Sequence, residues 1–395
     1  MNASHIRSRH RYGMSTIEHL SSMTNPDWFA EPQVEAVVTV EETSLLTGQP
    51  VNVAFNASPL GVSGIGAIFA GEDGRVRFFD STLERTYWTR RMDAGVYSSL
   101  IAIPHTKDLI VASVDGMVVR LDLRGHAHWV SRLGHPVYGT IAFLEDGRTA
   151  VIPSFGHKAF LLDIHTGQVI ASVDGRGTFN SRFAFALAYH RALYASPTIR
   201  ADGCFVIVDH DVVSCYRPSG ARVWESRSAG LIRSSPVAVG DAVITCTTTG
   251  VLQRWDKAGN NEYSIRLNGR VDASPAVQGG NVIVSSRESG TESFQVDSGE
   301  LRWRTPAVRA FEYTSIVALP SGVCVMTTDR GTVVGLDTES GDFVWETSQV
   351  LGRPDRSTSV ETTPAICADG LMYVASYSGD CYRFRFPTQR KDDPR

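Results

Sequence analysis

The sequence predicts an all-β protein that folds as one eight-bladed β-propeller of four-stranded antiparallel blades. The first observation is a five-residue phrase that recurs eight times, with Ser or Thr at its fourth position in every copy. The second observation is the spacing of those positions, which is 41, 41, 56, 39, 39, 41 and 48 residues. A period of about forty residues is typical of β-propellers. The fourth positions are Ser58, Ser99, Thr140, Ser196, Ser235, Ser274, Ser315 and Thr363.

Each copy of the phrase is followed by the same pattern of strands and turns. An apolar strand leads through a short turn to a second strand rich in β-branched residues, and a turn that contains glycine follows. A third strand ends in aspartate, and a fourth strand carries tryptophan in five repeats, as Trp88, Trp129, Trp224, Trp303 and Trp345. One blade cannot bury both of its faces, so the blades must stack around an axis.

The last repeat needs one more strand, because little sequence remains after Phe386. The apolar stretch 34–40 precedes the first repeat and is predicted to complete blade eight, which closes the ring and removes exposed sheet edges. The predicted organisation is therefore a propeller over 34–387 and a tail over 388–395. Residues 1–33 are predicted to be a poorly ordered extension that adds little to the core.

Composition and charge narrow the classes of partner. The chain has 395 residues, of which 42% are hydrophobic and 20% charged, as in ordinary globular proteins. Its net charge is only −4, and no stripe combines basic with aromatic residues, so neither nucleic acid nor a membrane is an expected partner. The N-terminal region has no apolar run typical of a signal peptide, and the six cysteines form no CxxC motif. We therefore expect free thiols and a cytoplasmic location.

The segments between the third and fourth strands resemble a known repeat. They are LDLRGHAHW (121–129), YRPSGARVW (216–224), VDSGELRW (296–303) and LDTESGDFVW (336–345). Together with the recurring phrase, they resemble the PQQ-like propeller repeats of quinoprotein alcohol dehydrogenases and of the lipoprotein that assists outer-membrane protein assembly. The resemblance covers roughly residues 52–387. It implies the fold, whereas the repeat describes packing between blades rather than chemistry.

The cofactor of the quinoprotein dehydrogenases is not expected here. The resemblance implies that such enzymes hold PQQ against a vicinal Cys–Cys disulfide, with a calcium ion on Glu, Asn and Asp. This chain has no adjacent cysteine pair, and no residue maps onto the calcium ligands. We therefore expect no cofactor and no metal. The outer-membrane lipoprotein has a lipidated N-terminal cysteine, but the first cysteine here is Cys204, so that role is not favoured either.

The second residue of each phrase is predicted to face the mouth of the central channel. These eight residues are Asn56, Tyr97, Tyr138, Tyr194, Arg233, Asp272, Tyr313 and Glu361. Desolvation in a narrow mouth raises the pKa of a carboxylate toward neutrality, and tyrosine hydroxyls can donate to a developing oxyanion. The predicted catalytic residues are therefore Asp272, Glu361, Tyr313 and Arg233. Asn56, Tyr97, Tyr138, Tyr194 and His210, which replaces a turn glycine, are the predicted substrate-binding residues. The alternative is structural: an Arg233–Asp272 salt bridge between blades, and tyrosines that plug the channel.

Two long spacings come from insertions that are predicted on the same face, over 176–192 and 350–359. The first contains four aromatic residues, and enlarged loops on one face of a rigid ring commonly carry binding function. The main functional prediction is a small molecule bound in the channel mouth, with a cofactor-independent isomerase, lyase or cyclase as the expected type if the protein is an enzyme. The alternative prediction is a scaffold that docks a protein partner through these insertions. A quinone-dependent dehydrogenase is the lesser alternative.

Overall fold

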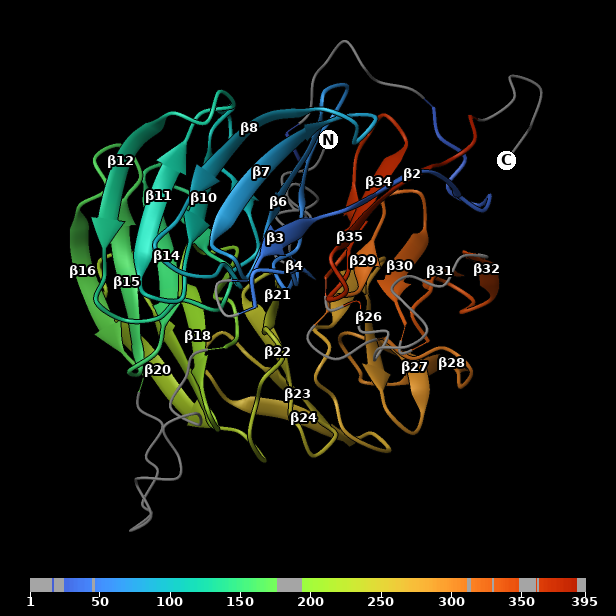
Figure 1. The fold of residues 1–395 in the computed structure, drawn as a ribbon. Coiled ribbons are helices and arrows are strands. Elements are labelled where there is room, and N and C mark those ends of the chain that lie inside the picture. Colours follow the sequence, from blue (N-terminus) through green and yellow to red (C-terminus); the bar gives the residue numbers. More distant parts are fainter. Residues whose placement is uncertain are drawn as a thin grey trace.

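The computed structural model confirms the eight-bladed propeller (Figure 1). It describes residues 16–17, 25–44, 47–175, 194–310, 314–328, 330–347, 360 and 362–388. Each blade is an antiparallel sheet whose four strands follow one another in sequence from the axis outward, except in the last blade. Within this described part of the chain, no helix has the length and apolarity needed to cross a membrane.

The strands of the first four blades lie at regular intervals along the chain. Blade one contains β5 (Leu60–Val62), β6 (Gly66–Ala70), β7 (Arg75–Asp80) and β8 (Thr86–Arg91). Blade two contains β9 (Ile101–Ala102), β10 (Leu109–Ala112), β11 (Met117–Leu121) and β12 (Ala127–Arg132). Blade three contains β13 (Ala142–Phe143), β14 (Thr149–Ser154), β15 (Lys158–Asp163) and β16 (Val169–Asp174). Blade four contains β17 (Thr198–Ile199), β18 (Phe205–Asp209), β19 (Val212–Tyr216) and β20 (Arg222–Arg227).

The second half of the ring repeats this arrangement. Blade five contains β21 (Val237–Val239), β22 (Ala242–Cys246), β23 (Val251–Trp255) and β24 (Asn261–Arg266). Blade six contains β25 (Ala276–Gln278), β26 (Asn281–Ser286), β27 (Gly290–Gln295) and β28 (Leu301–Thr305). Blade seven contains β29 (Val317–Ala318), β30 (Val323–Thr327), β31 (Val333–Asp337) and β32 (Phe343–Glu346). Blade eight contains β33 (Ala365–Ile366), β34 (Leu371–Ala375) and β35 (Asp380–Arg385).

An N-terminal strand closes the ring, as predicted. Strand β2 (Gln33–Thr39) pairs antiparallel with β35 and becomes the outermost strand of blade eight, so that blue and red segments meet in Figure 1. Glu35 of β2 also forms ion pairs with Arg383 and Arg385. Closure therefore joins strands that lie about 350 residues apart in sequence.

Short N-terminal elements flank this closing strand. Strands β3 (Glu41–Thr43) and β4 (Pro50–Asn52) form a small hairpin before the first phrase, and β1 (Thr16–Ile17) pairs in parallel with the innermost strand β5. Trp28 packs edge-on against Phe386, with ring centroids 4.8 Å apart. Residues 25–32, which belong to the expected extension, therefore contact blade eight.

The core lies between neighbouring blades. The second and third strands of most blades are almost entirely buried, as in β10, β22 and β30, whereas outermost strands such as β24 alternate between exposed and half-buried residues. The hydrophobic clusters span pairs of blades, and one of them joins blade one to blade two. Burial therefore depends on the stacking of blades.

The Ser or Thr hydroxyl that recurs in every copy of the phrase connects adjacent blades at the axis. In five places, the backbone N–H of a fourth-position residue donates to the side-chain oxygen of the fourth-position residue in the next blade, at 2.9–3.0 Å. We call this set the hydroxyl belt. The five donor and acceptor pairs are Thr140 and Ser196, Ser196 and Ser235, Ser235 and Ser274, Ser315 and Thr363, and Thr363 and Ser58.

The five repeated tryptophans connect adjacent blades farther from the axis. Each indole N–H donates to a backbone carbonyl of the next blade or of the segment that leads into it, at 2.8–3.0 Å. A turn glycine of the following blade lies against the ring in four cases, at Gly125, Gly167, Gly259 and Gly341. In blade five, Tyr263 occupies the same register position, and its hydroxyl donates to the Val296 carbonyl at 2.8 Å. Blade three has Ala171 at this position, so the junction with blade four lacks the tryptophan contact.

The aspartates that follow the third strands cap the next turn. Asp122 accepts backbone N–H groups of Arg124 and His126, and Asp163 accepts those of His165 and Thr166. Burial alone would raise the pKa of Asp163, but its hydrogen bonds to Arg148 and to the turn backbone lower it to about 2. The repeated aspartate therefore has a structural role.

The hydroxyl belt predicts a specific cost for Ser196→Ala. The change removes the acceptor of the Thr140 N–H, so we expect the free energy of unfolding to fall by about 1–2 kcal/mol in guanidinium denaturation. Ser196→Thr keeps a hydroxyl, as Thr140 and Thr363 do naturally, and should lose less than half as much. Equal losses in both variants would contradict a role for the hydroxyl.

The tryptophan contact predicts a second, larger cost at Gly259. A Cβ there would lie 2.5 Å from Cδ2 of Trp224, and the residue has a φ of 86°. Gly240 has a φ of 59° but no atom within 4 Å of such a Cβ, so it isolates the backbone effect. We expect Gly240→Ala to cost about 1 kcal/mol and Gly259→Ala about 3 kcal/mol by chemical denaturation. A similar loss of unfolding free energy in the two variants would show that the Trp224 indole can move away from the added methyl group at little cost.

Candidate functional site

A cavity of about 310 Å³ lies at the axis of the ring, at the end where the phrases begin. All eight fourth-position hydroxyl residues line it. Six of the eight second-position residues line it as well, namely Asn56, Tyr97, Tyr138, Tyr194, Arg233 and Asp272. Tyr313 and Glu361, and the insertions at 176–192 and 350–359, lie outside the described residues. The cavity is at the small end of the range for ligand pockets.

Aromatic side chains from blades two to four form one wall of this cavity. The Tyr97 and Tyr138 ring centroids are 5.1 Å apart, and those of Tyr138 and Tyr194 are 5.8 Å apart. Phe155, from the turn between β14 and β15, stacks on Tyr138 with centroids 4.4 Å apart. Phe155 does not itself line the cavity but supports the tyrosines that do, and we call these four residues together the aromatic wall. The recurring phrase predicts that the three tyrosines face the mouth. Phe155 lies outside the phrase, in the turn between β14 and β15, so only the position of that turn could have indicated it.

The predicted base Asp272 is held by an arginine of its own blade. Its side chain is 1% exposed, and both Nε and Nη2 of Arg270 donate to its two carboxylate oxygens. A bidentate guanidinium fixes the position and orientation of a carboxylate. Arg270 therefore holds Asp272 in place at the mouth. Arg270, two residues before Asp272, was not anticipated; the sequence prediction paired Asp272 with Arg233 instead.

A second carboxylate at the mouth, Glu72, was also missed. It comes from the turn between β6 and β7, and its Oε1 accepts hydrogen bonds from the Asn56 amide and, at 2.7 Å, from the Tyr97 hydroxyl. Burial and the neighbouring Glu72 carboxylate raise the pKa of Tyr97 well above its usual value near 10. Glu72 also borders a second cavity, of about 650 Å³. In each blade, the turn between the second and third strands lies on the same face as the phrase. A carboxylate in such a turn could therefore have been predicted from the sequence to lie near the mouth.

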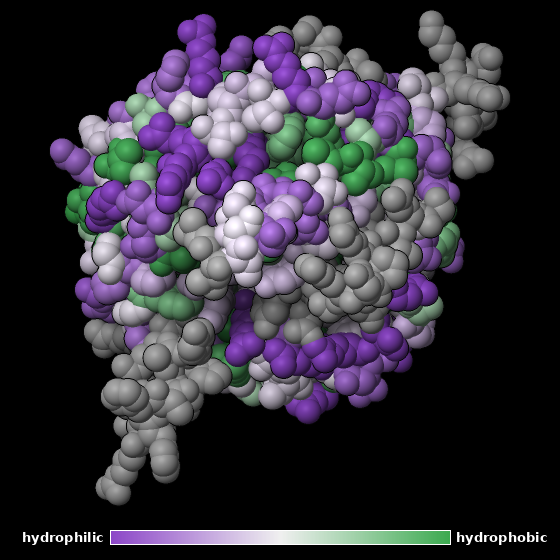
Figure 2. Space-filling view, viewed as in Figure 1, coloured by the Kyte–Doolittle hydropathy of each residue, from purple (hydrophilic) through white to green (hydrophobic). Residues whose placement is uncertain are grey.

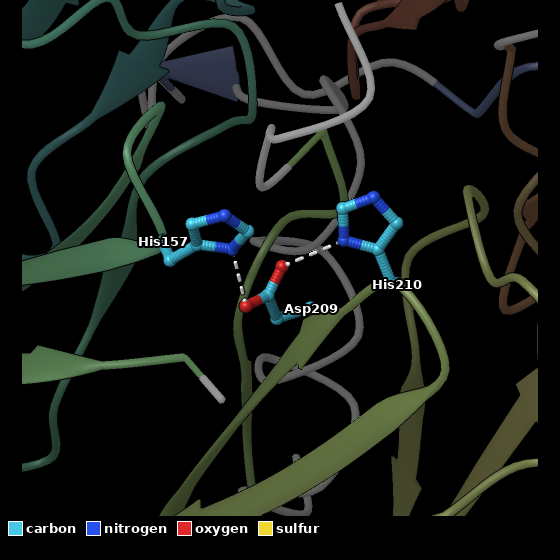
Figure 3. A group of neighbouring side chains, drawn as sticks. All are labelled: His157, Asp209 and His210. Carbon is cyan, nitrogen blue, oxygen red and sulfur yellow. Dashed lines mark hydrogen bonds and ion pairs between the residues drawn. The ribbon is translucent and has the colours of Figure 1, made fainter. Parts of the chain in front are cut away.

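His210, a predicted substrate-binding residue, does not line the axial cavity. Its Nδ1 is 3.2 Å from Oδ1 of Asp209, whose Oδ2 is 2.7 Å from Nδ1 of His157 in the preceding blade (Figure 3). The structure therefore groups His210 with residues that the sequence did not single out. On the face shown in Figure 2, hydrophilic side chains are widespread and apolar ones form separate small groups.

Comparison with known proteins identifies the type of repeat. A family model described as outer membrane protein assembly factor BamB matches residues 209–392. A protein of that name from Bordetella pertussis is 24% identical over 168 residues, which cover 41% of this chain and 43% of the relative. These matches support the resemblance of the chain's repeats to PQQ-like β-propeller repeats.

Two solved structures support the propeller fold of this chain. BamB from Moraxella catarrhalis superposes with a TM-score of 0.67 at 17% identity, covering 90% of this chain and all of that one. The computationally designed Ika8 protein superposes with a TM-score of 0.69 at 13% identity and the same coverage. Because a designed ring matches as well as a natural one, this structural similarity shows the fold and says nothing about function.

The comparisons contradict the cytoplasmic location expected from the sequence. Both the matching family model and the Bordetella pertussis relative are described as outer membrane protein assembly factors. The expectation depended on an absent signal-like run and on scattered cysteines. The described cysteines are free, and five of the six are buried, so core packing accounts for them without reference to a reducing compartment.

The Glu72–Tyr97 pair predicts the ionisation of Tyr97. In spectra of protein labelled with ¹³C at tyrosine Cζ, the Tyr97 resonance should stay in its neutral position above pH 10, because ionisation would place a phenolate beside a carboxylate. Glu72→Gln should shift its midpoint to lower pH. The 45% exposed Tyr87 provides the reference resonance. If Tyr97 ionises at the same pH in the wild type and in Glu72→Gln, the hydrogen bond between Glu72 and Tyr97 is excluded.

Proposed function

We propose that this protein is a protein-interaction scaffold that serves the assembly of outer membrane proteins. The observation that carries the proposal is the sequence match over 209–392 to the model described as outer membrane protein assembly factor BamB. The Bordetella pertussis relative of that name supports it over 168 residues, although the match spans less than half of that protein. A rigid ring held by contacts between blades suits a docking platform.

We further propose that the partner binds on the face that contains the axial mouth. The aromatic wall lies on this face, and tyrosine and arginine are enriched at the centres of protein interfaces. Two described residues on either side of the insertion 176–192 are Gly175 and Tyr194. Gly175 packs against Asp209, and Tyr194 lines the mouth.

The carboxylates of the mouth are held by neighbouring side chains. Asp272 is paired with Arg270, and Glu72 accepts hydrogen bonds from Asn56 and Tyr97. Carboxylates held in this way are fixed in position, which suits a docking surface. A small-molecule enzyme is an alternative outcome of the test.

The decisive experiment measures binding to the purified outer-membrane assembly complex of the host organism by biolayer interferometry. The double variant Tyr138→Ala/Phe155→Ala should weaken binding at least tenfold, because it removes the stacked centre of the aromatic wall. Ile170→Ala is the matched control, since this 57% exposed residue of β16 lies on the outermost strand of the same blade.

A cellular measurement accompanies it. Deletion of the gene should lower the amount of folded outer membrane proteins, and the wild type and Ile170→Ala should restore it better than the double variant. No binding to the complex, together with normal outer membrane proteins in the deletion strain, would refute the proposal. If the axial cavity binds a small metabolite instead, the alternative of a small-molecule enzyme would be favoured.

A further inference from the structure

Three side chains from two neighbouring blades meet in one cluster (Figure 3). His157 comes from the turn between β14 and β15 in blade three. Asp209 ends β18, and His210 follows it in the turn to β19 of blade four. The two carboxylate oxygens of Asp209 face different imidazoles, at 2.7 Å from His157 Nδ1 and 3.2 Å from His210 Nδ1. One ligand atom from each residue lies within 4.8 Å of the other two.

The backbone at both histidines adopts a conformation that normally selects glycine. His157 has a φ of 62° and His210 a φ of 57°, whereas the corresponding turns of blades two and five have Gly116 and Gly250 at 87° and 77°. A left-handed conformation costs a non-glycine residue about 1–2 kcal/mol. Such strain is commonly retained at functional sites. Here it occurs in neighbouring blades and directs both imidazoles at the same carboxylate.

The donor set fits zinc. Two imidazole nitrogens and one carboxylate oxygen are ligands that Zn²⁺ prefers, whereas Ca²⁺ and Mg²⁺ prefer oxygen alone. Asp209 is 1% exposed, His210 11% and His157 25%, so the carboxylate is enclosed and the ion can enter past His157. Gly175 preserves this space, because a Cβ there would lie 2.7 Å from Asp209 Oδ2. We propose that His157, Asp209 and His210 bind a zinc ion, which leaves a fourth position for water or a partner's side chain.

The location suggests what the ion does. Blades three and four meet at the junction where Ala171 replaces the tryptophan, so this junction lacks the indole contact that joins most other blades. Its described polar connections include the Tyr216 hydroxyl bonded to the Asp174 carbonyl at 2.8 Å. A zinc ion shared by His157 of blade three and two residues of blade four would tie this junction beside the turn between β14 and β15.

The test uses the full-length protein after treatment with a chelator. Titration with Zn²⁺ against a chromophoric competitor should give one tight site per chain, and Co²⁺ at that site should give the visible absorption of four-coordinate cobalt. Zinc should also raise Tm by about 3 °C when its free concentration is a hundred times Kd.

Glycine variants separate binding from folding. His157→Gly and His210→Gly should each lower zinc affinity at least a hundredfold, yet the metal-free variants should still fold, as circular dichroism would show, because glycine suits both φ values and offsets part of the cost of the lost hydrogen bond to Asp209. His105→Gly is the matched control: this exposed histidine has a φ of 61° and lies outside the cluster, so affinity should not change. Zinc binding that is equally tight in all three variants, or absent from the wild type, would overturn the assignment.

Discussion

The hydroxyl belt is the constraint on which the rest of the ring depends. Outside blade one, where β1 pairs with β5, an innermost strand has a neighbour in its own blade on only one side, so backbone N–H groups near the axis need partners from the next blade. A serine or threonine at the fourth position of the phrase supplies that partner, as Ser196 does for the Thr140 N–H. Residues two positions apart on an extended chain point to the same side. The hydroxyl that faces the axial cavity therefore directs the second residue of the phrase into the same cavity, which is why Tyr138 and Asp272 line one opening although they belong to different blades.

What repeats in the sequence could be predicted, and what depends on neighbouring blades could not. The period fixed the number of blades, the apolar stretch before the first repeat predicted the closing strand β2, and the phrase placed six described residues at the mouth. The actual partners of those residues were missed. Glu72 and Phe155 come from turns between second and third strands, whose reach toward the axis depends on how the blades pack. Arg270 lies only two residues from Asp272, but nothing in the spacing distinguishes it from Arg233 as the partner of that carboxylate.

The repeat also explains why fold and function separate in this protein. The residues that define it, such as Trp224 and Gly259, hold one blade against the next and would serve any ring of this kind. The match to the assembly-factor family model begins at residue 209, whereas Tyr97, Tyr138 and Phe155 of the aromatic wall precede it. The aromatic wall therefore lies in the part of the ring that this match does not cover. The proposed docking function assigns the recognition of a partner to blades two to four.

These same blades connect the aromatic wall to the histidine cluster. Phe155 and His157 belong to one turn, with Phe155 stacked on Tyr138 and His157 bonded to Asp209 across the junction. That junction has Ala171 where other blades have tryptophan, so fewer contacts oppose a relative shift of blades three and four. Any ligand that holds His157 and His210 on Asp209 restrains this shift and, through two intervening peptide bonds, the position of the Phe155 ring. The histidine cluster and the aromatic wall therefore share one turn of blade three, which is the structural connection between them.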